Sequence, residues 1–196
     1  MNEAAPRFFF GAMSPYSWFA AERIELLLPE ARWSGVLAGA IFKANDRVSW
    51  GLTERRQAGM ADCDARAAQH GLGPIRWPEP WPTSDLLIAR GMTHAQALGL
   101  LKPFSLAAMR LAFLEGADLG ERDAVLEAGR RSGIEPGDLD RALDSEQVKQ
   151  GLRDVTGEAL DLGVFGVPTI VLGGKLYWGD DELERAAVDQ RALPGA

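Results

Sequence analysis

Two serines three residues apart, Ser14 and Ser17, lie where the apolar segment FFFGAM meets an amphipathic segment. Cysteines at this spacing would form a redox-active pair, since thiolates and disulfides exchange electrons. Serine hydroxyls cannot do this, so the segment SPYS does not support disulfide oxidoreductase activity. A hydroxyl at the start of a helix can instead donate a hydrogen bond to an anion, because backbone amides and the helix dipole already favour negative charge there.

A purely structural role for Ser14 is also open. Pro15 is typical of the first position of a helix, which makes Ser14 the expected N-cap. Its side-chain oxygen would then accept a backbone N–H, a bond worth about 1 kcal/mol. A Ser-His-Asp hydrolase is not indicated, because both histidines of the sequence, His70 and His94, fall within helical patterns.

A second motif follows Gly163 and Gly166, where Val167-Pro168-Thr169 begins a β-type segment. A proline that enters a strand is typical of a sheet edge or a special turn, and the bond before it can be cis. In that geometry the backbone N–H and C=O of Val167 are free to pair with an extended ligand. A simple edge proline is the alternative.

The composition is that of an ordinary globular protein. The 196 residues are 46% hydrophobic and 25% charged, which suits one large core or one domain inserted in another. The net charge of −7 disfavours nucleic acids and anionic membrane surfaces as partners. No apolar run approaches the roughly 20 residues that span a bilayer. The start MNEAAPRFFF lacks the pattern of a signal peptide, so we expect a cytoplasmic location.

Cys63 is the single cysteine, which excludes an internal disulfide and a thiolate-rich zinc site. We therefore expect no metal. Cys63 lies in a helical pattern with acidic neighbours, which raise rather than lower the pKa of a thiol. The expected role is that of a partly buried helix residue and not of a nucleophile.

Four segments have the composition of β-strands: residues 7–12, part of 32–42, 168–174 and 175–179. Gly173-Gly174, between the last two, is a strong hairpin signal. From about residue 46 to residue 163, apolar residues recur at helical spacing. The first long helix of this block is expected between the N-cap candidate Thr53 and Gly71, and residues 180–193 predict a final amphipathic helix.

This order of elements is β-α-β, a long helical block, then β-β-α. It predicts an α/β fold with a large inserted all-helical domain. We assign residues 1–45 and 164–196 to the α/β domain and residues 46–163 to the insertion. The Pro- and Trp-rich connector over residues 73–84 is expected to form a stiff, extended wall.

The segments SPYSWFA, GVFGVPT and YWGDDEL together resemble the DsbA-like thioredoxin superfamily, whose element order also matches. More narrowly, the chain resembles 2-hydroxychromene-2-carboxylate isomerase and its relatives, the kappa-class glutathione transferases. The resemblance covers almost the whole chain. It implies a thioredoxin-like fold, glutathione as cofactor, a small aromatic or electrophilic substrate, and a homodimer.

The resemblance also implies roles for residues in these motifs. Ser14 matches the serine that hydrogen-bonds the glutathione sulfur. Val167, before the expected cis Pro168, matches the residue whose backbone pairs with the cysteinyl backbone of glutathione. The loop that receives the γ-glutamyl end matches Trp178, Gly179, Asp180 and Asp181. Asp181 would meet the ligand's ammonium group, although helix-start acids favoured by the dipole explain both aspartates as well.

The chain departs from the family pattern at two places. Relatives tend to carry an arginine after the acid of that loop, where this chain has Glu182. They also tend to have an Asn-containing, Pro-rich loop after the second strand, which FKANDRVSWGLTERR replaces here. Lys43 is the first candidate to bind a substrate anion, with a solvated lysine as the alternative. The other candidate substrate-binding residues are Asn45, Arg47, Trp50 and Ser84.

An aromatic substrate requires an apolar pocket, and several aromatic residues could wall it or belong to the core. They are Phe8, Tyr16, Trp50, Trp77 and Trp81. The mechanism implied by the resemblance is addition of a bound thiolate to a conjugated carbon, ring opening, bond rotation and elimination. Two alternatives stay open: a kappa-like transferase that consumes glutathione, and a thioredoxin-like binding module without redox cysteines.

Overall fold

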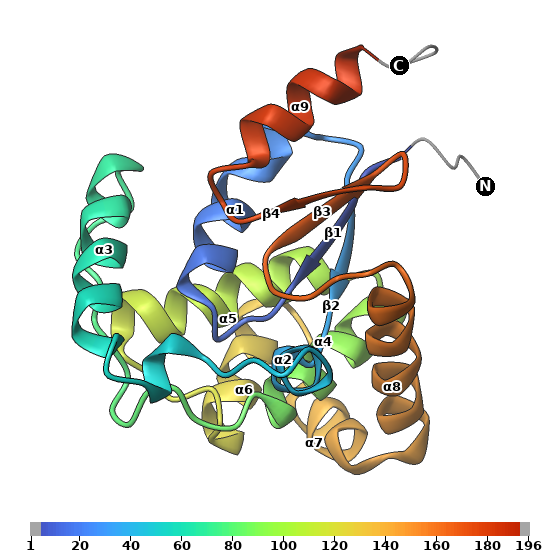
Figure 1. Ribbon diagram of the computed structural model, residues 1–196. Helices are drawn as coiled ribbons and strands as arrows, with labels where there is room; N and C mark the ends of the chain where they lie inside the picture. Colours follow the sequence, from blue (N-terminus) through green and yellow to red (C-terminus); the bar gives the residue numbers. More distant parts are fainter. Residues whose placement is uncertain (1–4, 193–196) are drawn as a thin grey trace.

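Four short strands form a single mixed sheet in the computed structural model, which describes residues 5–192 (Figure 1). The sheet has the order β2-β1-β3-β4. The strands are β1 (Arg7–Phe10), β2 (Arg32–Gly35), β3 (Thr169–Leu172) and β4 (Lys175–Trp178). β1 pairs in parallel with β2 and antiparallel with β3, which forms an antiparallel hairpin with β4. Gly173 and Gly174 form the turn with φ of 57° and 76°, as the sequence predicts.

Helices fill the chain between the strands. Those outside the helical block are α1 (Pro15–Leu27), α2 (Ala38–Ala44) and α9 (Leu183–Arg191). The block between β2 and β3 contains the 3-10 turn η1 (Trp50–Leu52), α3 (Arg56–Gln69), α4 (Leu86–Ala97), α5 (Leu101–Glu115), α6 (Arg122–Arg131), α7 (Pro136–Asp144) and α8 (Glu146–Asp161). The expected α/β fold with a helical insertion between two halves of one sheet is therefore confirmed.

The strand predicted within residues 32–42 is confirmed as β2, which ends at Gly35. The helix α2 over residues 38–44, rich in the helix former alanine, was not predicted. The predicted start of α3 was wrong. α3 begins at Arg56 rather than after Thr53. The Thr53 hydroxyl donates to the Trp50 carbonyl at 2.8 Å and accepts from the Arg55 N–H at 3.2 Å, so it closes a turn before the helix.

The alternation of side chains along β1 divides the core into two layers. Phe8 and Phe10 point to one face and pack with Trp33 and with apolar residues of α1, α4 and α5. Phe9 points to the other face, toward Val171 and the α2 and α8 side of the sheet. The sheet therefore shares its larger core with the helical insertion.

The division into residues 1–45 with 164–196, and residues 46–163, stays a prediction. Residues 1–4 and 193–196 of that division lie outside the described residues. Among the helices that the structure describes, none combines the length and the apolar character that crossing a membrane requires.

Candidate functional site

Ser14 caps the first helix of the fold. Its backbone is extended, with φ of −92° and ψ of 119°, and its Oγ accepts a hydrogen bond from the Ser17 N–H at 3.3 Å. The prediction of an N-cap is therefore confirmed. Ser14 is half-buried, and its hydroxyl donates to no group within residues 5–192. The cap uses the oxygen as an acceptor, so the O–H is still available to donate to an anion at the positive end of α1.

Ser17, the second serine of the motif, has a structural role. It is fully buried, and its Oγ accepts a hydrogen bond from the Gly11 N–H at 3.4 Å. This contact ties the first turn of α1 back to the end of β1. Ser14 is thus the serine of the pair that can face a ligand.

The peptide bond between Val167 and Pro168 is cis, as the sequence suggested. Neither the backbone N–H nor the C=O of Val167 has a hydrogen-bond partner in the described part of the chain. An unpaired N–H and C=O on one residue are what an extended ligand needs to add to a sheet edge. The backbone of Val167 is therefore competent for the pairing that the motif predicts.

Gly11 brings Val167 close to the cap of α1. A Cβ at Gly11 would lie 2.9 Å from the Cβ of Ala38 and 3.6 Å from a methyl carbon of Val167. The Gly11 carbonyl in turn accepts the N–H of Ser14 at 3.1 Å. Because a larger residue would clash with Ala38, glycine allows three segments to meet beside Ser14.

The loop after β4 packs directly against this proline segment. The Gly179 N–H donates to the Pro168 carbonyl at 3.0 Å, and Trp178 is 44% exposed. A Cβ at Gly166 would lie 2.5 Å from the indole nitrogen of Trp178, so this ring covers the glycine. The two C-terminal motifs of the sequence therefore form one surface.

The two aspartates of this loop have different environments. Asp180 is 2% exposed, and it accepts a hydrogen bond from Arg66 Nη1 at 2.9 Å, with His70 Nε2 at 3.5 Å. Burial is the main reason that the pKa of Asp180 is raised, and the Arg66 charge opposes it. Asp181 is exposed and makes no ion pair within residues 5–192. Asp181 is therefore the member of the pair that can meet a charged ligand, whereas Asp180 holds the loop to α3.

Aromatic side chains extend from the Ser14 motif into the helical block. Tyr16 lies 6.2 Å from Trp50, and Trp50 lies 5.0 Å from Trp81, between ring centroids. Trp77 lies 4.7 Å from Trp81, whose indole N–H donates to the carbonyl of Met13 at 3.3 Å. Tyr16, Trp50 and Trp77 are only half-buried, so each offers part of its ring to a ligand.

Phe8, the fifth aromatic candidate, does not belong to this wall. It is fully buried in the core, where its ring stacks on Phe10 at 4.9 Å and meets Trp33 edge-on at 5.1 Å. A position in the middle of β1 that points into the larger core has no access to a ligand. The interpretation of Phe8 as a core residue, left open by the sequence, is the correct one.

The segment after α2 reaches the same surface through Arg47. The guanidinium carbon lies 4.7 Å from the Trp178 ring centroid and 5.4 Å from that of Phe165. Lys43 is exposed in the last turn of α2, and Asn45 caps that helix by donating to the Ile41 carbonyl at 2.9 Å. Of the cations in this segment, Arg47 is therefore held beside the proline motif.

Ser84 is exposed at the start of α4, where its Oγ accepts the Leu86 N–H at 3.4 Å. The neighbouring Asp85, which the sequence analysis did not single out, makes a long-range contact. Its Oδ2 accepts the Gly39 N–H at 3.1 Å, at the start of α2. In the sequence, Asp85 is recognisable only as an acidic residue before an apolar helix. That pattern predicts a cap of α4 itself, whereas the structure shows a contact with α2, 46 residues earlier in the chain.

Burial raises the pKa of Asp85 above its ordinary 3.8, and the amides of Gly39 and Ala38 only partly offset this. Because the protonated form is favoured in the folded state, the carboxyl contributes its full stability below about pH 3.8 and loses it as the pH rises through the folded-state pKa. Asp85→Asn cannot ionise. We expect urea unfolding between pH 3.5 and pH 7 to show a smaller loss of unfolding free energy in this variant than in the wild type. An equal loss in both proteins would contradict this assignment.

Cys63 is fully buried, more deeply than predicted. The pKa of its thiol is raised to about 12, chiefly by burial, with Asp62 adding to the effect. The direction of this shift is as predicted, but its main cause is burial rather than the neighbouring acids. Cys63 is thus not a thiolate at neutral pH and cannot serve as a nucleophile.

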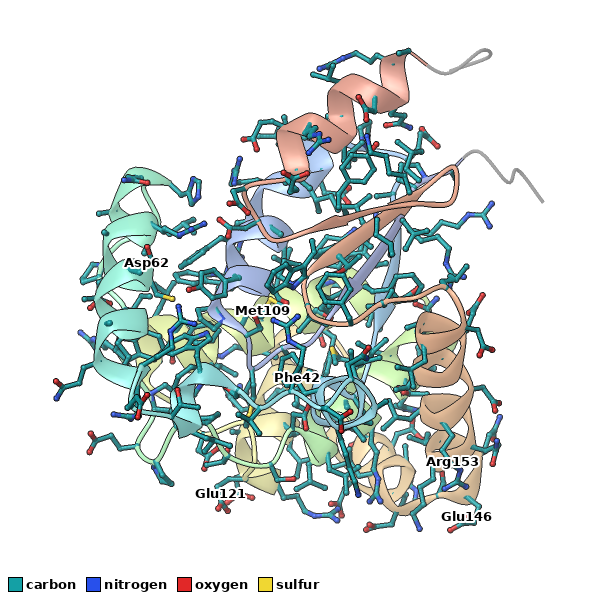
Figure 2. The ribbon with its side chains drawn as sticks, viewed as in Figure 1. Phe42, Asp62, Met109, Glu121, Glu146 and Arg153 are labelled. Atoms are coloured by element: carbon teal, nitrogen blue, oxygen red, sulfur yellow. The ribbon has the colours of Figure 1, made fainter. Side chains whose placement is uncertain are left out.

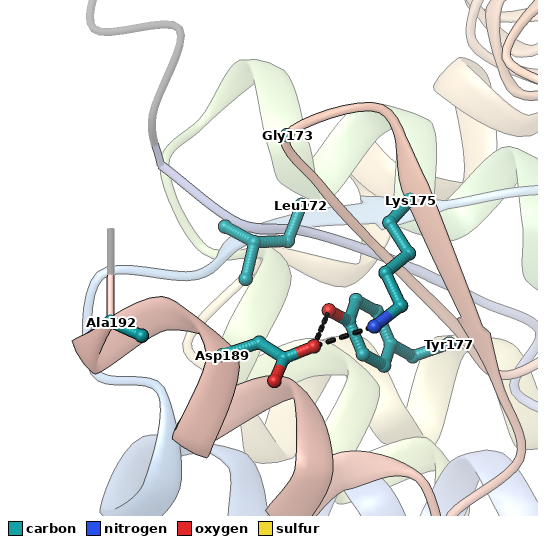
Figure 3. Close-up of a pocket in the computed structure, with 6 residues that line it drawn as sticks. All are labelled: Leu172, Gly173, Lys175, Tyr177, Asp189 and Ala192. Atoms are coloured by element: carbon teal, nitrogen blue, oxygen red, sulfur yellow. Dashed lines mark hydrogen bonds and ion pairs between the residues drawn. The ribbon is translucent and has the colours of Figure 1, made fainter. Parts of the chain in front are cut away.

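A cavity of about 270 Å³ lies at the opposite end of β3 from Pro168 (Figure 3). Its polar side chains already bond to one another: Lys175 Nζ and the Tyr177 hydroxyl both donate to Asp189 Oδ2, at 2.6 and 2.5 Å. The charged side chains that line this cavity are therefore already paired with one another. The described residues also contain no cluster of His, Cys, Asp and Glu side chains that could hold a metal ion.

The fold and the site agree with a comparison to known families. The model of the DSBA-like thioredoxin domain matches residues 7–189, which include every strand and the whole helical block. The chain is a DSBA-like thioredoxin domain protein. The family resemblance drawn from the three motifs is therefore confirmed.

Relatives of this DSBA-like protein include an isomerase. The chain is 25% identical over 195 residues to 2-hydroxychromene-2-carboxylate isomerase of Sphingobium xenophagum, covering 90% of this chain and 93% of that protein. A solved 2-hydroxychromene-2-carboxylate isomerase superposes with a TM-score of 0.83 at 20% identity, over 96% of this chain and 95% of that one. A probable DsbA oxidoreductase from Streptomyces coelicolor gives a TM-score of 0.78 at 18% identity, over 97% and 91%.

Proposed function

We propose that this DSBA-like protein is a glutathione-dependent isomerase of the 2-hydroxychromene-2-carboxylate type. The proposal rests on one observation: a hydroxyl that is free to donate lies in the same region as a backbone N–H and C=O that have no partner. Ser14 caps α1 with its O–H available, and Val167, which approaches Gly11 beside the cap, has an unbonded N–H and C=O. The relative from Sphingobium xenophagum is named as this isomerase, and the similarity extends over nearly the full length of both chains.

The residues at the site suit glutathione. The backbone of Val167 can pair with a peptide, Ser14 can donate to sulfur, and the exposed Asp181 can receive an ammonium group. Cys63 is too buried and too weakly acidic to take the place of this thiol. When bound, glutathione would supply the nucleophilic thiolate that adds to a conjugated carbon of the substrate and leaves after bond rotation.

The chain's own residues would prepare this chemistry. The O–H of Ser14 donates to a negatively charged sulfur, and the N-terminus of α1 favours that charge, so both lower the pKa of a bound thiol. The half-buried rings of Tyr16, Trp50 and Trp77 would orient a planar substrate. Isomerisation involves no net oxidation or reduction, so the enzyme needs no redox-active cysteines. This agrees with serines at both positions of the motif.

Arg47 is the cation that we propose for the carboxylate of the substrate. Both side chains are exposed, but the guanidinium of Arg47 lies against the Trp178 and Phe165 rings, whereas Lys43, on the last turn of α2, has no such ring contact among residues 5–192. At saturating glutathione, Arg47→Gln is expected to raise KM about tenfold with little change in kcat, because a charge-assisted bond of about 1.4 kcal/mol is lost. Lys43→Gln serves as the matched control, with less than a twofold change expected. A larger effect in the lysine variant would contradict this assignment.

The proposed function is tested by binding and by mass balance. Calorimetric titration should show glutathione binding at millimolar concentration or tighter. Incubation with 2-hydroxychromene-2-carboxylate should then produce the isomer while the amount of free glutathione stays constant. Consumption of glutathione would instead show a kappa-like transferase. Absence of glutathione binding would overturn both enzymatic functions and leave a binding module.

A further inference from the structure

The connector between α3 and α4 contacts the start of α1 through Trp81. α3 stands beside α1 at the edge of the molecule, and Asp62 marks its position in Figure 2. The indole N–H of Trp81 donates to the carbonyl of Met13 at 3.3 Å, and Met13 immediately precedes the helix cap Ser14. Trp81 is 6% exposed and Met13 is 9% exposed, so this bond is shielded from water. A side chain 68 residues further along the chain therefore holds the backbone next to the hydroxyl that the proposed function requires.

The peptide group between Met13 and Ser14 is held on both sides by groups outside α1. The Ser14 N–H donates to the Gly11 carbonyl at 3.1 Å, and within residues 5–192 the Met13 carbonyl accepts from the indole of Trp81 alone. Ser14 is extended, so the hydrogen bonds of the helix do not fix the peptide that precedes it. Gly11 and Trp81 therefore fix the orientation of this peptide, and with it the direction in which the Ser14 side chain leaves the backbone.

Trp81 is itself fixed from several sides. Its carbonyl accepts a hydrogen bond from Arg56 Nε at 3.2 Å. Its ring centroid lies 5.0 Å from that of Trp50 and 4.7 Å from that of Trp77. A Cβ at Gly51 would lie 2.6 Å from the ring, so glycine at that position leaves room for the indole. The donor N–H is thus held in one orientation by contacts that all come from the helical block.

Other indoles of the chain make the same kind of bond in other places. Trp77, in the same aromatic cluster, donates to Asp64 Oδ1 of α3 at 3.2 Å. Trp33, which is 5% exposed in the larger core, donates to Glu25 Oε1 at 3.1 Å. Among the indoles with a hydrogen-bond partner in the described residues, Trp81 is thus the one that bonds to the segment leading into α1.

We propose that Trp81 is a positioning residue, whose indole N–H orients the peptide between Met13 and Ser14 so that the Ser14 hydroxyl points at the sulfur of a bound thiol. The inference rests on the proposed function, since that sulfur belongs to glutathione. A donor stabilises a thiolate only when it is aimed at it, and a misplacement of about 1 Å can lower a rate by about two orders of magnitude. In this role Trp81 acts through Ser14, so the helical block adjusts a group that belongs to the sheet side of the fold.

Two replacements of Trp81 remove the donor. Trp81→Phe removes the N–H together with part of the ring. Replacement by 3-benzothienylalanine keeps the bicyclic shape and has sulfur in place of the N–H, so it tests the donor alone even if the phenylalanine variant folds poorly. With either replacement, turnover is expected to fall about tenfold. The pKa of the bound glutathione thiol, followed by ultraviolet absorbance, should rise by less than it does in Ser14→Ala.

Trp33→Phe is the matched control, because it removes an equally buried indole N–H that bonds far from Ser14 along a different helix face. It should lower stability and leave the thiol pKa and turnover unchanged. A double-mutant cycle then shows whether Trp81 acts through Ser14. Trp81→Phe should have no further effect on turnover or on the thiol pKa in a Ser14→Ala background, because no hydroxyl is left to aim.

Three results would overturn the inference and leave the proposed function standing. The first is a thiol pKa that neither replacement of Trp81 changes. The second is an equal loss of turnover from Trp81→Phe in the wild-type and Ser14→Ala backgrounds, which would show a purely structural role. The third is the same rise in thiol pKa in Trp33→Phe. Failure of the wild type to bind glutathione at all would overturn both the inference and the proposed function.

Discussion

Ser14→Ala is expected to lower turnover about a hundredfold at neutral pH. The variant loses the hydrogen-bond donor that stabilises the negative charge on the sulfur of the bound thiol. The pKa of the bound glutathione thiol should rise, since the Ser14 Oγ accepts the Ser17 N–H at the start of α1 and leaves its O–H to donate to the sulfur. The ultraviolet absorbance of the thiolate, followed against pH in the complex, measures this shift directly. Turnover should recover in part at higher pH.

The same substitution also removes a helix cap, which the control must separate from the catalytic effect. Ser145 caps α8 in the same manner, with its Oγ accepting the Val148 N–H at 3.2 Å. Ser14→Ala and Ser145→Ala should each lower the unfolding free energy by about 1 kcal/mol. Only Ser14→Ala should change the thiol pKa and turnover. Wild-type turnover in that variant would remove Ser14 from the mechanism.

Phe113→Ala is expected to lower the unfolding free energy of the whole protein by about 3–5 kcal/mol. Phe113 of α5 is fully buried, and its ring stacks on Trp18 of α1 at 5.5 Å and approaches Trp77 at 6.1 Å. The side chain therefore joins the helical insertion to the helix that carries Ser14. Thermal unfolding should shift down by about 10 °C.

The form of this transition tests how the two parts of the chain are coupled. Because one core spans the sheet and the insertion, tryptophan fluorescence and far-ultraviolet circular dichroism should report a single coincident transition. Leu26→Ala is the control: this α1 residue is 87% exposed, so its loss should change stability by less than about 0.5 kcal/mol. Two separate transitions in Phe113→Ala would show that the insertion unfolds as an independent unit.

The parts of the site that were predictable from sequence depend on neighbours in the chain. The cap at Ser14 follows from Ser-Pro at a helix start, and the hairpin follows from Gly173-Gly174. The cis bond between Val167 and Pro168 was likewise indicated by the residues at those two positions. Each of these depends on a few consecutive residues, for which local conformational preferences are decisive.

The parts that were not predictable depend on distant partners. α2 has only seven residues, and Asp85, 46 residues beyond Gly39, binds its first turn. Asp180 and Asp181 are identical in type and adjacent in sequence, yet Asp180 is buried against Arg66 and His70 while Asp181 is exposed. Such choices between equivalent residues are made by tertiary packing.

The burial of Cys63 has a consequence for the behaviour of the protein under oxidative stress. A thiol that is fully enclosed and has a pKa of about 12 is protonated and inaccessible, so peroxide and alkylating reagents react with it slowly. The protein then has no reactive thiol of its own, and under the proposed function the reactive thiol would be a replaceable one that arrives with each new ligand molecule. An oxidised thiol of that kind would be replaced by exchange with solution, without repair of the protein.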